Sequence, residues 1–224
     1  LIIFAAVFRI PTLASPFIED EAISLNRYIE VPWQKLIFSY HDTNQHTLFL
    51  LISKLFIWIF GESEIIYRFP SFLFGVLSIP LMYRLGMTMK FPWSSALLSS
   101  VLMALSWPHL KYSMEGRGYG ITIFLVLLVI YSAIQFLNRS CWVWGSILIV
   151  SGFAMTMALP SNLFFLGGLT VFTVIVGWFD SENSRFNIKR LFWLAIPQLI
   201  MFAVIAIYFF VIYEQLKYGK DIQP

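Results

Sequence analysis

The chain has 224 residues, of which 59% are hydrophobic and 12% are charged, and its mean hydropathy is +0.78. Soluble domains average about 25% charged residues. The composition therefore excludes an ordinary soluble fold and indicates an integral, multi-pass membrane protein. The net charge of +3 gives no case for nucleic-acid binding, and a single cysteine, Cys141, excludes an intramolecular disulfide.

The first 64 residues predict the end of one span followed by a long loop. Residues 1–10 are apolar and predict the last part of a first span, so we expect both chain ends to be cuts in a longer protein. Residues 11–64 predict an external loop that contains short helices. Within it, residues 47–60 are apolar but reach only about 21 Å as a helix, against roughly 30 Å for the hydrocarbon core. They predict an interfacial helix or a short tilted span.

Six further apolar segments predict transmembrane helices, because only a helix satisfies its own backbone hydrogen bonds in lipid. These segments are 65–86, 91–108, 119–137, 141–159, 162–179 and 191–213. With the first span they predict an all-α bundle of about seven spans. The whole range 1–224 is then the N-terminal part of one transmembrane domain, and residues 214–224 begin the next external loop.

Basic residues orient this bundle. If residues 47–60 do not span, six basic residues in short loops share one side: Arg84, Lys90, Arg139, Arg185, Lys189 and Arg190. The short loops opposite hold two, Lys111 and Arg117. The positive-inside rule places the six in the cytoplasm. The loops 11–64 and 106–118 then face the external side.

The long loop opens with three consecutive acids, Glu19, Asp20 and Glu21. A carboxylate near the bilayer surface is partly desolvated, which makes it a candidate general base. The acids can also hold a divalent cation. Alternatively they stabilise the first turn of a helix, where negative charge is favourable. The sequence leaves these alternatives open.

The segment 112–120 lies between two predicted spans and contains Glu115 and Arg117 among three glycines. A guanidinium suits a phosphate, and glycine lets a ligand or another backbone approach closely. A local pair of Glu115 with Arg117 explains the segment equally well. Arg9 and Arg68, at external span ends, either reach toward headgroups or join Arg117 in a cationic rim that attracts a lipid phosphate.

A third polar patch covers residues 41–46 and includes Asn44 and His46. Its two histidines and one aspartate can bind a metal ion. Such loops more often make local hydrogen bonds only. His109, in the second external loop, is interpreted as interfacial rather than catalytic.

Taken in order, these segments resemble the polyprenyl-phosphate-sugar-dependent glycosyltransferases of the GT-C superfamily. The match is best with the protein-mannosyltransferase and aminoarabinose-transferase group and covers about the first 137 residues. The resembling positions are Arg9, Asp20 and Glu21, 44–51, 60–64, 68–71, 74–75, 83–86 and 112–119. The later spans agree with the family in hydropathy only.

The resemblance implies a membrane enzyme that moves a sugar from a polyprenyl phosphate to a hydroxyl or amine, with inversion. The acceptor is a protein, lipid or glycan on the external face of a bacterial plasma membrane. Asp20 is implied as the catalytic carboxylate and Glu21 as its assistant or an acceptor ligand. Arg9 and Arg68 match functional basic positions of the family. From its own chemistry we assign Arg117 to the donor phosphate.

Four further residues are candidates around that site: Glu115, Tyr112, His46 and Asn44. No cofactor is required, although a divalent cation could assist as a Lewis acid. Two other functions compete. A transporter or lipid flippase predicts ionisable groups near span midpoints. A noncatalytic scaffold predicts that Asp20 and Arg117 lie far apart.

Overall fold

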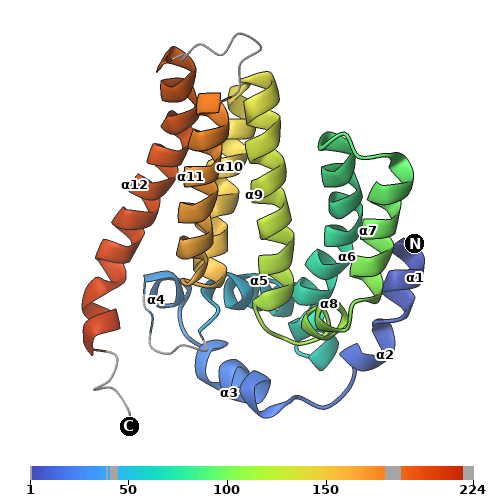
Figure 1. Cartoon of the computed structure of the whole chain (residues 1–224). Helices are drawn as coiled ribbons and strands as arrows, with labels where there is room; N and C mark the ends of the chain where they lie inside the picture. The colour runs from blue at the N-terminus through green and yellow to red at the C-terminus, as the bar shows by residue number, and fades with distance from the viewer. Residues whose placement is uncertain (1, 39, 41–44, 180–187, 219–224) are drawn as a thin grey trace.

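Figure 1 shows the computed structural model, which describes residues 2–38, 40, 45–179 and 188–218. Over these residues the chain is all-helical, which confirms the predicted all-α class. In chain order the helices are α1 Ile2–Val7, α2 Ile10–Leu13, α3 Glu19–Tyr28, α4 Trp33–Phe38, α5 Thr47–Phe60, α6 Glu64–Thr88, α7 Trp93–Leu105, α8 Trp107–Tyr112, α9 Tyr119–Arg139, α10 Trp142–Ala158, α11 Asn162–Phe179 and α12 Ile188–Tyr218.

Three of these helices are long and apolar enough to cross a membrane: Glu64–Thr88, Tyr119–Arg139 and Phe192–Tyr213. The 25 residues of α6 extend about 38 Å at 1.5 Å per residue, more than the hydrocarbon core requires. Three of the predicted spans are thus confirmed as helices that are long and apolar enough to cross a membrane. The other apolar helices among the described residues are shorter, so the expected total of about seven spans is not reached by this criterion.

The segment 91–108 departs most clearly from its prediction. It was expected to be one span, but α7 ends at Leu105 after 13 residues, about 20 Å of helix. Ser106 then adopts an extended conformation, with φ −62° and ψ 124°. Pro108 lies in the first turn of α8, where a missing N–H is tolerated. The apolar run is therefore divided between two helices.

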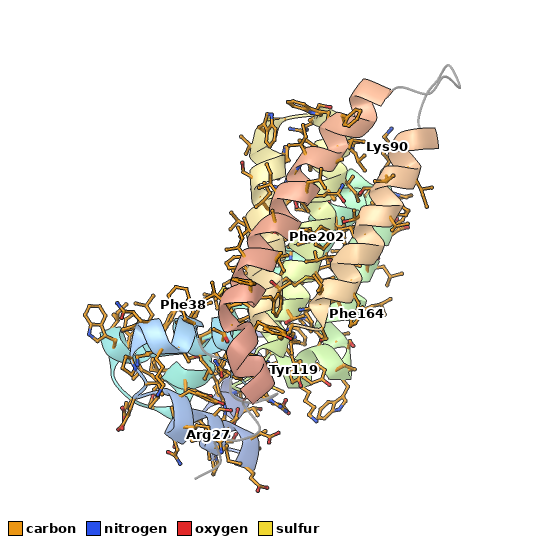
Figure 2. The ribbon with its side chains drawn as sticks, turned by 90° about the vertical axis from the view of Figure 1, so that its left-hand side faces the viewer. Arg27, Phe38, Lys90, Tyr119, Phe164 and Phe202 are labelled. Atoms are coloured by element: carbon orange, nitrogen blue, oxygen red, sulfur yellow. The ribbon has the colours of Figure 1, made fainter. Side chains whose placement is uncertain are left out.

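The short helices gather at one end of the bundle. Figure 1 shows α3, α4, α5 and α8 at the end where α9 begins, while α6, α7 and α9–α12 run along its length. We call this the loop end. Figure 2 shows Arg27 and Tyr119 at the loop end and Lys90 at the opposite end. Helix α5, whose role was ambiguous in the sequence, is therefore one of the loop-end helices.

A continuous hydrophobic core fixes the loop end to the long helices. Buried residues of α3, α4, α5 and α6 share one cluster with residues of α9–α12. Its buried members are Tyr28, Leu36, Phe49, Leu50, Tyr67, Ile121, Leu125, Val129, Ala133, Leu148, Met155, Ala158, Leu166, Met201 and Ile205. The loop-end helices and the long helices therefore share one core.

Two polar residues in the apolar helix α5 anchor it to its neighbours. The hydroxyl of Ser53 donates to the carbonyl of Tyr67 at 3.0 Å. Lys54 donates through Nζ to the carbonyls of Ile29, at 2.8 Å, and Val31. These bonds tie α5 to α6 and to the connection between α3 and α4. They also explain how this helix accommodates a lysine.

Candidate functional site

The three acids predicted as a site form the first turn of α3. Glu21 accepts the backbone N–H of Ile18 at 3.1 Å, which caps the helix start. Successive helical residues point about 100° apart, so Asp20 and Glu21 face different surroundings. The side chain of Glu21 is 1% exposed and that of Asp20 is 42% exposed. The adjacent acids therefore occupy two distinct sites.

Glu21 is the centre of a buried ion pair with Arg68 of α6. Arg68 donates through Nε to Oε1 at 2.9 Å and through Nη2 to Oε2 at 2.5 Å. The backbone N–H of Gly116 also donates to Oε1. Together with Ile18, four N–H groups converge on one carboxylate. Glu21 thus joins α3, α6 and the connection before α9.

Arg68 uses its remaining donors on the chain that precedes α3. It donates to the carbonyls of Leu13 at 2.9 Å, Ser15 at 2.5 Å and Pro16 at 3.1 Å. A guanidinium has five N–H groups, and these partners account for all of them. The phosphate role expected for Arg68 stays a prediction, because a phosphate would have to replace these acceptors.

Asp20 and Arg117 form a second, more open ion pair. Arg117 Nη1 lies 3.0 Å from Asp20 Oδ2, and 18% of the Arg117 side chain is exposed. The guanidinium also lies over the ring of Tyr119, 5.0 Å from its centroid. The hydroxyl of Ser71 donates to the carbonyl of Arg117 at 2.6 Å, which fixes its backbone. The two residues on which the sequence analysis depended are therefore in contact.

Two glycines allow Arg117 to reach this position. A Cβ at Gly116 would lie 2.5 Å from the ring of Tyr67 and 3.0 Å from Glu21 Oε1. A Cβ at Gly118 would lie 3.0 Å from His46. The backbone at Gly116 thus approaches Tyr67 too closely for a side chain, and the backbone at Gly118 lies in tight contact with His46. These contacts give the predicted glycines a physical reason.

His46 lies beside the open ion pair. Its Nδ1 is 3.1 Å from the carbonyl of Ala158, and its ring packs edge-on against Tyr119 at 5.1 Å. Burial lowers the pKa of His46. The hydrogen bond to Ala158 and the charge of Asp20 oppose this shift, while the charge of Arg117 adds to it. Because the pKa falls below its ordinary value of about 6.5, the imidazole is neutral at pH 7.

The other candidate residues have different surroundings. The ring of Tyr112 packs against Tyr119 at 4.8 Å, so Tyr112 belongs to the same cluster. Glu115 pairs with Lys111 at 3.7 Å rather than with Arg117. Asn44 lies outside the described residues. Within the described part of the chain, no three His, Cys, Asp or Glu side chains converge in metal-binding geometry.

Arg9 lies in a separate buried network. It donates to Ser113 Oγ at 2.7 Å, to the carbonyl of Ala5 at 2.6 Å and to His109 Nδ1 at 3.0 Å. His109 Nε2 then lies 2.8 Å from Ser78 Oγ. Burial, followed by the charge of Arg9, lowers the pKa of His109 to about 4. The donor-phosphate role expected for Arg9 also stays a prediction.

Sequence reasoning did not single out Ser113 or Ser78, and it treated His109 only as interfacial. One indirect signal exists for Ser113. A Cβ at Gly75 would lie 2.2 Å from Ser113 Cβ, so Gly75 marks close contact between α6 and the end of α8. Tyr67, which lies beside Gly116, was also missed. Nothing in its surrounding sequence distinguishes it from an ordinary apolar position.

The fold and the site define an all-α protein with three helices that are long and apolar enough to cross a membrane. The ion pairs of Glu21 with Arg68 and of Asp20 with Arg117 lie at one end of its bundle. Comparison with protein-family models, with curated proteins and with solved structures found no match to this chain.

Proposed function

We propose that this protein is a membrane glycosyltransferase that moves a sugar from a polyprenyl phosphate to a hydroxyl or amine. The acceptor is a protein, lipid or glycan, and the anomeric centre is inverted. One observation carries the proposal: Asp20 and Arg117 lie 3.0 Å apart at the loop end, and both keep exposed surface. Such a transfer requires a base for the acceptor beside a cation for the leaving phosphate.

In the proposed topology, α1, α6, α7 and α9–α12 form about seven spans, and α3, α4, α5 and α8 lie along the membrane surface. The loop end faces the external, periplasmic side of a bacterial plasma membrane. The position of Lys90 at the opposite end supports this orientation (Figure 2). Arg84 and Arg139, near the ends of α6 and α9, belong to that same opposite side.

The reaction is a single displacement. An acceptor oxygen or nitrogen attacks the anomeric carbon while the bond from that carbon to the phosphate oxygen breaks. The bonding electrons leave with the phosphate, and Asp20 takes the acceptor proton. Arg117 donates hydrogen bonds to the developing phosphate charge. Arg117 therefore exchanges Asp20 for the phosphate when the donor binds.

Arg117 suits this role better than the two other arginines. Its side chain is 18% exposed, whereas Arg9 is fully buried and Arg68 is 2% exposed. Glu21 and Arg68 instead hold the first turn of α3, and with it Asp20, against α6. Their contribution to transfer is to position the base.

The positions of charges favour this proposal over a transporter. The charged residues of α6 are Glu64, Arg68 and Arg84, which lie within the five residues at either end of the helix. In α9, Arg139 is the terminal residue. A transporter requires ionisable or unwound groups near the bilayer midplane.

The test replaces Asp20 by Asn in the protein as it is expressed in its native cell. Transfer from a polyprenyl-phosphate sugar is then measured in isolated membranes. Loss of a general base lowers the rate by about 10²–10⁴-fold, and we expect a loss in this range. Glu19→Gln is the matched control, because Glu19 is an exposed acid one position earlier. If D20N membranes keep full turnover while the protein is correctly inserted, Asp20 is not the base and the proposal fails.

A further inference from the structure

Two buried polar atoms beside the open ion pair lack a hydrogen-bond partner among the described residues. They are Nε2 of His46 and Oη of Tyr67. His46 is 4% exposed and Tyr67 is fully buried. More than nine in ten buried polar groups in proteins are hydrogen-bonded. Two exceptions next to one candidate site therefore need an explanation.

Both residues flank the segment that presents Arg117. The ring of Tyr67 meets Gly116 and the ring of His46 meets Gly118, at the short Cβ distances given above. The ring of Tyr119, labelled in Figure 2, packs against His46 and beneath the Arg117 guanidinium. One residue with an unpaired polar atom thus packs against the glycine on each side of Arg117. They come from different parts of the chain, the start of α5 and the first turn of α6.

The chemistry of each atom follows from its neighbours. The carbonyl of Ala158 can only accept, so Nδ1 of His46 carries the proton and donates to it. In the neutral ring, Nε2 is then a hydrogen-bond acceptor with a free lone pair. The Tyr67 hydroxyl both donates and accepts. Phe17 and Phe49 pack edge-on against the Tyr67 ring at 5.4 and 5.2 Å, and they offer no polar partner.

We infer that His46 and Tyr67 form the subsite that reads hydroxyl groups of the transferred sugar. One sugar hydroxyl donates to Nε2 of His46, and a second exchanges a hydrogen bond with Tyr67. The inference rests on the proposed function and deepens it by naming residues that select the substrate. A site built to pair with a hydroxyl discriminates strongly against an analogue that lacks it, because its own polar atom is then left unpaired.

The experiment measures kcat/KM with a panel of polyprenyl-phosphate pentoses and hexoses and with donors that lack one hydroxyl each. In the unaltered protein, kcat/KM with one of the deoxy donors should be at least tenfold lower than with the parent sugar. Tyr67→Phe should lose a similar factor with the parent sugar. It should lose nothing more with that deoxy donor, because the same hydrogen bond is already absent. Its thermal stability should be unchanged or higher, since an unpaired buried hydroxyl is removed.

His46 is tested by two substitutions that differ in one feature. In His46→Asn the amide nitrogen can replace Nδ1 opposite Ala158, but nothing replaces Nε2. In His46→Gln the longer side chain places an amide near Nε2. We expect kcat/KM with the parent sugar to fall at least tenfold in the Asn variant and to fall less in the Gln variant. Tyr131→Phe is the control, because the Tyr131 hydroxyl accepts from Gln135 in α9 at 3.1 Å.

The outcomes separate the two proposals. Suppose that the unaltered protein transfers sugar. If Tyr67→Phe and His46→Asn then lose the same factor in kcat/KM with each deoxy donor as the unaltered protein loses, the subsite is wrong and the proposed function stands. If the unaltered protein transfers none of the sugars, the proposed function fails and the subsite fails with it.

Discussion

Replacing Glu21 by Gln should weaken the fold far more than the matching change at Asp20. Glutamine keeps the shape of Glu21 but converts one of its two oxygens into an NH₂ group. Each oxygen now accepts two N–H donors, one of them from Arg68. Whichever oxygen position the NH₂ group takes, the two N–H groups that donated to that oxygen now face a donor. The buried guanidinium also loses its counter-charge.

The size of the effect follows from burial. Breaking a buried ion pair from one side costs about 3–5 kcal/mol, and the Glu21 and Arg68 side chains are 1% and 3% exposed. The pair of Asp20 with Arg117 is partly exposed, at 42% and 18% of the two side chains, and a surface ion pair is worth about 0–1 kcal/mol. We therefore expect E21Q to lower the free energy of unfolding by several kcal/mol and D20N by less than about 1 kcal/mol.

The assay is denaturant unfolding of the protein purified in detergent, with both variants and Glu19→Gln measured in parallel. Activity gives a second comparison, since D20N should be inactive although folded. An E21Q protein as stable as D20N would refute the assignment of Glu21 as the residue that holds α3 to α6. The acceptor-binding role implied by the resemblance would then be the better reading of Glu21.

Two further predictions follow from close contacts and from a shifted pKa. Gly116→Ala should lower stability by about 1–3 kcal/mol, as overpacking does, because its Cβ would collide with Tyr67; a thermal-unfolding midpoint equal to that of the unaltered protein would contradict this. The pKa of His109 is about 4 in the fold, so the unfolded chain takes up a proton near pH 6.5 while the fold does not. The contribution of His109 to the free energy of unfolding is therefore fully present above pH 6.5 and is lost as the pH falls toward 4. It decreases by about 2 kcal/mol between pH 7.5 and 5. His109→Gln should remove that part of the decline in denaturant unfolding at the two pH values, and an unchanged difference would exclude His109 as its source.

The sequence was sufficient for those parts of the fold that depend on long apolar runs. Helices α6 and α9 begin and end within two residues of the predicted spans 65–86 and 119–137. The sequence analysis began the second external loop at residue 106 but continued the span to Pro108, so it did not decide whether α7 ends at Ser106 or runs on. A proline two residues later can either kink a helix or begin one. Only the packing of α8 against its neighbours decides between them.

For the site, the sequence indicated the residue types but not their partners. The predicted topology placed Asp20 and Arg117 in loops on the same side of the membrane, and the structure places them in contact. The sequence could not determine which of two adjacent acids turns inward, since that depends on where Arg68 lies. The sequence could not identify Tyr67 and His109 as site residues for the same reason. Their significance arises from contacts with residues far away in the chain.

Under the proposed function, the contrast between the two ion pairs explains how one site can combine a firmly held helix with an arginine that exchanges partners. A donor phosphate that competed for Arg68 would have to displace a buried carboxylate and several carbonyls, at about 3–5 kcal/mol for the ion pair alone. Competition for Arg117 displaces the carboxylate of Asp20, whose side chain is 42% exposed, at about 0–1 kcal/mol for that ion pair. Binding of a phosphate would then release Asp20 as a base without disturbing the helix that carries it. The buried pair of Glu21 with Arg68 keeps the released carboxylate in place, since Asp20 and Glu21 share the first turn of α3.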